Sequence, residues 1–134
     1  MQITVTEDTG GKTPVTIFHI TGDLDVQTSA EFEAKATEAN RNGTSRLLVD
    51  LTGVRYVSSA GLRSIHSVFN LLRARNPQEN DEVIQKGLRD ATFKSSLLKI
   101  VCPDEQVRQV FTLSGYDMFL EIHKDLQEAI RSFY

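Results

Sequence analysis

Near its middle the chain reads Val49-Asp50-Leu51-Thr52-Gly53-Val54-Arg55-Tyr56-Val57-Ser58-Ser59-Ala60-Gly61-Leu62. The apolar run from Leu47 to Leu51 is interrupted only by Asp50, which is typical of a strand covered on both faces. From Leu62 onward, apolar residues recur at intervals of three and four and predict an amphipathic helix that ends at Asn76-Pro77. The centre of the fold is therefore expected to be a buried strand, a loop and a helix that begins with two serines.

The residues before this stretch predict a β-hairpin followed by a helix. Ile3–Thr6 and Val15–Thr21 have strand-like patterns, and the Gly10-Gly11 pair between them supplies the positive φ that a reversal needs. A helix is expected after Thr28, which lies three residues before Glu31 as in a capping box. An Asn-Gly pair further along should end that helix.

The residues after the stretch continue to alternate between strands and helices, as in an α/β sheet. The predicted elements are a strand at 97–101, a helix capped by Asp104, a short strand at 118–122 and a helix at 125–133. Between the central helix and these elements lies a polar insertion, residues 77–96. Its weak periodicity through Val83, Leu88 and Phe93 allows a short helix, but its polar composition favours a loop.

Length and composition restrict the class of protein. A chain of 134 residues fits one domain, 1–134, and its 40% hydrophobic content excludes a wholly disordered chain. No apolar run reaches the ~18–20 residues that cross a bilayer, and the first residues do not resemble a signal peptide. The net charge of -3 argues against nucleic acid or anionic membrane as a partner. With one cysteine, Cys102, we expect a cytoplasmic protein without an internal disulfide.

Ser58 and Ser59 have two possible roles at the start of the central helix. A serine at a helix N-terminus accepts a hydrogen bond from a first-turn N–H, and most such serines are only caps. The same position favours a dianion, because N–H groups point outward and the helix dipole is positive there. A kinase could therefore modify a serine here without unfolding the domain.

Several motifs together resemble one protein family. Asp50-Leu51 and the run Ser59-Ala60-Gly61-Leu62 are similar to the strand end and helix start of the STAS-domain anti-sigma factor antagonists. Gly22-Asp23-Leu24-Asp25 resembles a second turn of that family, and residues 107–115 resemble its third helix with a Leu-Ser-Gly end. The resemblance implies an α/β domain: a mixed, mostly parallel sheet with an antiparallel N-terminal hairpin, packed by about four helices.

The resemblance also implies a switch that is not an enzyme. Ser59 falls on the family's phosphoacceptor, and Ser58 is the fallback because it stands where phosphorylated members usually carry Asp. The unphosphorylated form would bind an anti-sigma factor that is a serine kinase and release a sigma factor, and a serine phosphatase would reset it. No cofactor is implied, and the protein would be a monomer or a weak dimer. The expected contact surface comprises Asp23, Asp25, Arg55, Tyr56, Ser58, Ala60, Gly61, Leu62 and Arg63.

Other functions remain open or are disfavoured by the residues. A constitutive STAS scaffold, or a module that regulates a transporter without phosphorylation, would use the same surface. Catalysis by Ser59 is disfavoured, since His66 lies about two turns along the same helix and is too far to act as base. His19, His66 and His123 have no metal-ligand spacing, and no phosphate-binding loop motif is present. Within the expected surface, Gly61 should allow a partner's backbone to approach closely.

Overall fold

The computed structural model describes residues 1–91 and 93–134, without the side chain of Pro77. Five strands, five α-helices and two 3-10 turns are found in the described residues. In chain order they are β1 Gln2–Asp8, β2 Val15–Thr21, α1 Ser29–Arg41, β3 Leu47–Gly53, α2 Ser59–Arg73, η1 Pro77–Glu79, α3 Asp81–Arg89, β4 Leu98–Val101, α4 Glu105–Leu113, η2 Tyr116–Met118, β5 Glu121–His123 and α5 Leu126–Arg131.

The strands form one mixed sheet in the order β1-β2-β3-β4-β5. The β1–β2 pair is antiparallel, and every other neighbouring pair is parallel. This arrangement confirms the predicted α/β class with its N-terminal hairpin. β3 occupies the middle of the sheet, and its residues from Leu47 to Leu51 are all buried, as the apolar run predicted.

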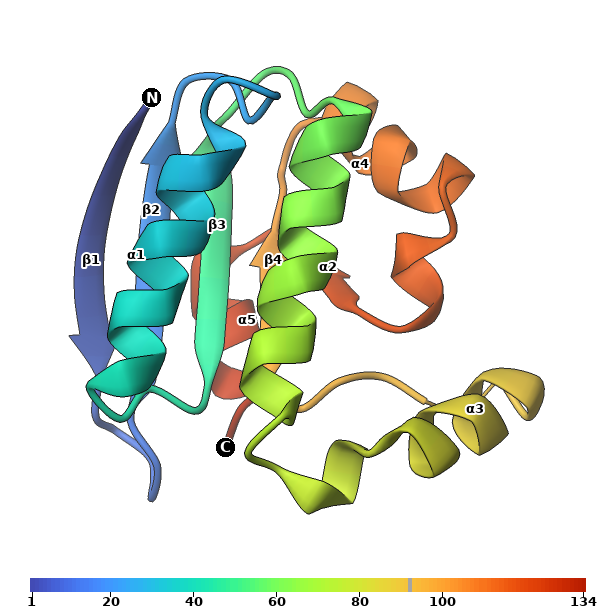
Figure 1. Cartoon of the computed structure of the whole chain (residues 1–134). Coiled ribbons are helices and arrows are strands. Elements are labelled where there is room, and N and C mark those ends of the chain that lie inside the picture. Colours follow the sequence, from blue (N-terminus) through green and yellow to red (C-terminus); the bar gives the residue numbers. More distant parts are fainter. Residues whose placement is uncertain (92) are drawn as a thin grey trace.

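The sheet carries helices on both faces (Figure 1), with α1 and α2 on one face and α5 on the other. The larger core, on the α1 and α2 face, includes Phe18, Phe32 and Ile65. The smaller core is built by α5 against Ile17 and Leu48. Because α5 is only six residues long, it covers only part of its face of the sheet.

The C-terminal segment is attached to the sheet by a buried lysine. Lys99 is 3% exposed, and its Nζ donates to the carbonyl oxygen (2.8 Å) and Oγ (3.1 Å) of Ser132. The same ammonium lies 2.9 Å from Oε2 of Glu121. A buried charge is tolerated when such partners surround it. The last residues are therefore an integral part of the fold.

The insertion contains a helix, so the expectation of a loop at residues 77–96 was wrong. α3 is capped by Asn80, whose Oδ1 accepts from the amide of Val83 (2.9 Å). It raises the number of α-helices from about four to five. The predicted strand at 118–122 also begins later, at Glu121, because the 3-10 turn η2 occupies the preceding residues.

A buried carboxylate closes the base of the insertion. Glu79 is 4% exposed and accepts hydrogen bonds from Ser95 Oγ (2.7 Å) and from the amide and Oγ of Ser96 (2.8 and 2.7 Å). Phe93 packs against the main core and lies near Phe69, with ring centroids 6.4 Å apart. The insertion is thus attached at its two ends and is not a slack connection.

Candidate functional site

The loop after β2 and the loop after β3 lie side by side, because parallel strands end at the same edge of the sheet. A parallel bridge joins Leu24 to Val57, and both side chains are buried. The amide of Leu24 donates to the carbonyl oxygen of Tyr56, and the amide of Ser58 donates to the carbonyl oxygen of Leu24. The N···O distance is 3.0 Å in both bonds. These bonds make the two loops one surface, which is the surface on which the sequence placed the candidate residues.

The two serines have different environments. Ser58 is the N-cap of α2, and its Oγ accepts a hydrogen bond from the amide of Gly61 (3.1 Å). Ser59 is the first helical residue and is exposed. No hydrogen bond to its hydroxyl is found within residues 1–91 and 93–134. The cap role therefore belongs to Ser58, while the hydroxyl of Ser59 is accessible.

Asp25 folds the loop just before α1. Its Oδ1 accepts from the amides of Gln27 (2.9 Å) and Thr28 (3.3 Å). The expected capping box was wrong, since the Thr28 side chain makes no cap bond to the helix. Instead, Thr28 Oγ1 accepts from the amide of Asp25 (3.0 Å) and donates to the carbonyl oxygen of Asp23 (2.9 Å). Asp25 is thus half-buried and engaged in the loop, whereas Asp23 is exposed.

Gly61 is buried inside the molecule, and the expectation that it makes room for a partner's backbone was wrong. A Cβ at this position would overlap the carbonyl oxygen of Leu24. The missing side chain lets the first turn of α2 pack directly on the loop after β2. Leu62, the next residue, is 7% exposed and belongs to the main core. Gly61 and Leu62 are thus buried beneath the surface of the two loops and determine how closely α2 packs against them.

The exposed part of the surface is formed by residues from both loops and from the first turns of α2. Tyr56 is 54% exposed, and Arg55, Asp23 and Arg63 are exposed as well. Ala60 is half-buried. Val26, which no sequence pattern singled out, is 76% exposed in the loop after β2. An apolar residue between Asp25 and Gln27 in a polar turn was the available signal.

Along α2, aromatic contacts explain His66. Its ring packs at 6.2 Å from that of Tyr116 and at 5.8 Å from that of Phe119, measured between centroids. Burial raises the pKa of the Tyr116 phenol, and the positive charge of Arg63 partly opposes this. Arg63 and η2 are therefore close, and the exposed surface extends from Ser59 toward the Tyr116 side of α2.

Asp50 has a structural role in the central strand. Its Oδ2 lies 2.8 Å from Nδ1 of His19 on β2, and Nε2 of that ring lies 2.9 Å from Oγ1 of Thr6 on β1. Its Oδ1 accepts from the amide of Thr52 (3.0 Å). The polar residue inside the apolar run is thereby satisfied by a hydrogen-bonded row across three strands.

Neither a metal-binding cluster nor a membrane-spanning helix is found in the part of the chain that the structure describes. In residues 1–91 and 93–134, no group of three or more His, Cys, Asp or Glu side chains is arranged to hold a metal ion. In the same part of the chain, no helix has the length and apolar character needed to span a membrane.

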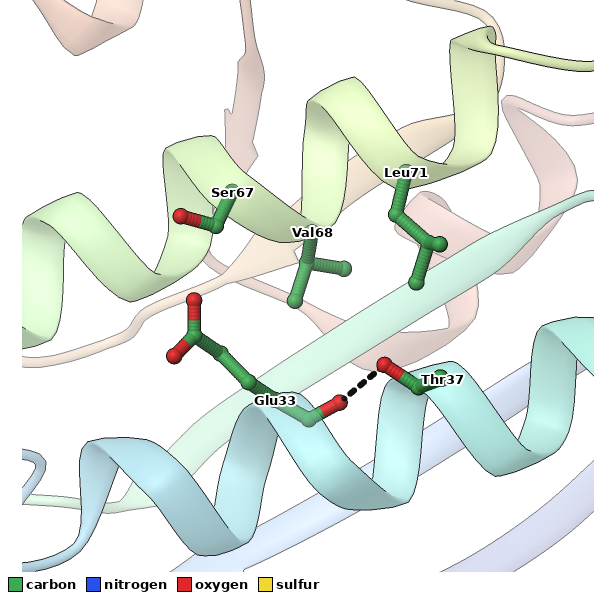
Figure 2. Close-up of a pocket in the computed structure, with 5 residues that line it drawn as sticks. All are labelled: Glu33, Thr37, Ser67, Val68 and Leu71. Atoms are coloured by element: carbon green, nitrogen blue, oxygen red, sulfur yellow. Dashed lines mark hydrogen bonds between the residues drawn. The ribbon is translucent and has the colours of Figure 1, made fainter.

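A small hollow between α1 and α2 lies apart from the serines. Its volume is about 200 Å³, and Figure 2 shows the residues that line it. They are Glu33, Thr37, Ser67, Val68 and Leu71. Thr37 Oγ1 donates to the carbonyl oxygen of Glu33 (2.8 Å), within α1. None of the candidate residues around Ser59 contributes to this hollow.

Comparison with solved structures shows the same fold in several proteins. An anti-sigma factor antagonist from Mycobacterium paratuberculosis is 18% identical, with a TM-score of 0.65 over 98% of this chain and 94% of that chain. A putative anti-sigma factor antagonist from Thermotoga maritima is also 18% identical, with a TM-score of 0.68 over 89% and 86%. The phosphorylated form of SpoIIAA, a Bacillus cell fate determinant, is 14% identical, with a TM-score of 0.58 over 98% and 100%.

Comparison at the level of sequence identifies the family. No curated protein sequence gives a significant match to this chain. The family model described as the STAS domain matches residues 4–78, which is more than half of the 134 residues. That range contains both functional loops, the bridge between them and the two serines. The chain therefore belongs to the STAS domain family.

Proposed function

We propose that this protein is an anti-sigma factor antagonist that is switched by phosphorylation of Ser59. The observation that carries the proposal is the exposed hydroxyl of Ser59 at the first position of α2, beside two loops that are bonded into one surface. The fold neighbours support it, since the Mycobacterium protein and SpoIIAA are described as anti-sigma factor antagonists, and one SpoIIAA structure is of the phosphorylated form.

In the unphosphorylated state the loop surface binds an anti-sigma factor that is itself a serine kinase. Binding displaces the sigma factor and thereby changes transcription. The exposed residues of this surface make the contact. Tyr56 and Val26 form its apolar part, and the charged residues around them are Asp23, Arg55 and Arg63. Aromatic residues surrounded by charged ones are typical of protein interfaces.

Phosphorylation weakens this contact through charge. A phosphoserine carries about -1.5 to -2 charges, so the net charge falls from -3 to about -5. The first amides of α2 and Arg63, one turn further on, can stabilise the phosphate in the free protein. Removing a dianion from water at the centre of a contact costs several kcal/mol, and each ~1.4 kcal/mol lowers affinity tenfold. A change of fold is not needed for the switch.

Ser59 is a better acceptor than Ser58 for a structural reason. Phosphorylation of Ser58 would disturb the bond that its Oγ accepts from the amide of Gly61. Loss of an N-cap costs about 1 kcal/mol, whereas Ser59 has no such role. Ser58 would be modified only at the expense of the first turn of α2.

The remaining features follow from the proposed partners. The kinase and a serine phosphatase set the phosphorylation state, and residues 1–134 act as one STAS-like domain, as a monomer or weak dimer, without a cofactor. Sigma factors act on the bacterial transcription machinery, which places the protein in the cytoplasm. Residues 77–96 form an insertion in this domain that carries α3.

Mass spectrometry of the protein from its native cells, with and without stress, tests the proposal. We expect one phosphate, located on Ser59 by fragmentation, whose occupancy changes with condition. Capture of partners by the wild type and by Ser59→Asp should differ at least tenfold for a partner with serine-kinase activity, with Ser67→Asp as an exposed control on the same helix. Equal capture by wild type and Ser59→Asp would indicate the constitutive scaffold instead.

A further inference from the structure

A cavity at the opposite end of the sheet from Ser59 combines two cations with two aromatic rings. Its volume is about 510 Å³, within the range of small-molecule sites. Its walls come from the turn residues 10–13, from Arg46 just before β3, and from Phe133 and Tyr134. In Figure 1 the turn between β1 and β2 and the C-terminus lie at the same end of the sheet, far from the loop between β3 and α2.

The turn and the Tyr134 ring fit each other closely. A Cβ added to Gly11 would lie 2.5 Å from Cδ1 of that ring, and one added to Gly10 would lie 3.0 Å from its hydroxyl oxygen. A Cβ at Gly11 would displace the Tyr134 ring from this position, so the Gly10-Gly11 pair makes room for the ring besides allowing the reversal. The result is one continuous wall of backbone and aromatic ring.

Arg46 is held in position by the chain's own backbone. Its Nη1 donates to the carbonyl oxygen of Phe133 (2.8 Å), and the residue is half-buried. A guanidinium has five N–H donors in a fixed plane. No other hydrogen bond of this side chain is found among the residues that the structure describes. One bond therefore orients the group, and the remaining donors are available to a ligand without much loss of side-chain entropy.

The charge of the cavity differs from that of the chain as a whole. The net charge is -3, yet Lys12 and Arg46 are the charged side chains that line the cavity, and no Asp or Glu side chain lines it. The nearby carboxylate of Asp8 is used within the turn, where its Oδ1 accepts from the amide of Gly10 (3.1 Å). Behind Phe133, the ammonium of Lys99 lies 4.6 Å from the ring centroid. Two cations, one from the turn and one from the residue before β3, thus line the cavity, while Lys99 is paired with Glu121 on the other side of the Phe133 ring.

We propose that this cavity binds a small organic anion. The carboxylate or phosphate group of this ligand is held by Lys12 and Arg46, and the flat apolar part of the ligand lies against the Tyr134 ring. An inorganic anion alone would leave the aromatic walls unused, and a neutral ligand would leave the two cations without a counter-charge. The site is separate from the loop surface and does not depend on phosphorylation of Ser59.

Titration of the ¹⁵N-labelled protein by NMR tests the site with four probes: phenyl phosphate, benzoate, inorganic phosphate and benzyl alcohol. We expect phenyl phosphate or benzoate to shift the amides of Gly10 and Gly11 with a Kd of about 1 mM, as fits a ligand of this size. Whichever of these two probes binds more tightly shows whether the site prefers a phosphate or a carboxylate group. The proposal would be overturned if benzyl alcohol or inorganic phosphate bound as tightly as the aromatic anions. It would also be overturned if neither phenyl phosphate nor benzoate shifted these amides.

Two variants and a control assign the binding to these residues. Lys12→Gln removes one charge-assisted hydrogen bond and should raise the Kd about tenfold. Tyr134→Ala should weaken the aromatic anions while leaving the affinity for inorganic phosphate unchanged. Lys124→Gln, which changes the net charge equally at an exposed site outside the cavity, should leave the Kd unchanged. An equal effect of Lys124→Gln and Lys12→Gln would show nonspecific charge attraction and overturn the site.

Discussion

The first turn of α2 and the helix α3 are held in place by different kinds of interaction. At the start of α2, a cap by Ser58 and the backbone contact of Gly61 with Leu24 combine with a strongly apolar helix face. α3 has no fully buried residue, and its segment is held by the bonds of Glu79 with two serines 16 and 17 residues further along the chain. The first region is stabilised mainly by fully buried residues, and the second by polar bonds at its base together with the partly buried side chains of Ile84 and Phe93.

The largest effect is expected at the close backbone contact. Gly61→Ala forces the first turn of α2 away from the Leu24 carbonyl group and should destabilise the protein by about 3 kcal/mol. Gly87→Ala in α3 is the matched control, because the added Cβ would come equally close to a neighbour, overlapping Cβ of Phe93 and lying 3.1 Å from its Cα, but in a peripheral segment. Alanine also gains about 1 kcal/mol of helix propensity over glycine. We expect it to cost about 1 kcal/mol or less. Urea denaturation measures both, and equal losses would contradict the comparison.

The next largest effect is expected at the polar bonds that hold the insertion. Glu79→Gln removes the charge from a buried acceptor of three hydrogen bonds and should cost about 2 kcal/mol. Hydrogen exchange should become faster in α3 before it does so in β3. Glu82→Gln, on the exposed side of α3, is the control and should change neither quantity. Uniform loss of protection across the sheet would show that the insertion unfolds only with the whole domain.

The two serines provide a smaller test within the first region. Ser58→Ala should lower the free energy of unfolding by about 1 kcal/mol, because the amide of Gly61 loses its cap. Ser59→Ala should stay within about 0.5 kcal/mol of the wild type, as is usual for exposed positions. Thermal unfolding of both variants measures this difference. The reverse order would mean that Ser59 is the structural residue and Ser58 the accessible one.

The smallest effect concerns pH and the end of β4. Burial raises the pKa of the Cys102 thiol from 9.0 to about 11. Since the unfolded chain then loses this proton first, stability is fully present below pH 9 and decreases as the pH rises toward 11. Between pH 8 and 9.5 the loss should be about 0.8 kcal/mol. Cys102→Ala should remove this part of the slope, and an unchanged slope would assign it to other groups such as the Tyr116 phenol.

Local rules predicted the parts of the fold that local interactions hold. β2, β3, α2 and the Asp104 cap of α4 follow from periodicity and capping, and Asp104 Oδ1 does accept from the first-turn amide of Gln106 (2.8 Å). α3 was missed because its anchor, Glu79, is satisfied by residues that are distant in the sequence. A mostly polar segment with a few dispersed apolar residues does not reveal such a bond.

For the candidate site, the sequence located the right loops but not the role of each atom. Asp25 and Thr28 both have capping chemistry, and only the backbone geometry decides that the carboxylate of Asp25 bonds the amides. Gly61 was placed at the surface, although the neighbour it approaches is Leu24 of the same chain. Exposure of Val26 depends on how the loop leaves β2, which a polar pattern does not specify.

The bridge between Leu24 and Val57 has a consequence for the kinetics of partner binding. Two loops that are already bonded to each other need no ordering step when a partner arrives. Association should then proceed at the rate of rigid docking, about 10⁵–10⁷ M⁻¹s⁻¹, in a single phase. If the bridge is weakened by Leu24→Pro, which removes the amide that donates to the carbonyl oxygen of Tyr56, a slower second phase should appear while the exposed residues of the surface stay the same. The rate at which this domain exchanges partners would thus be set by the dissociation rate of each complex.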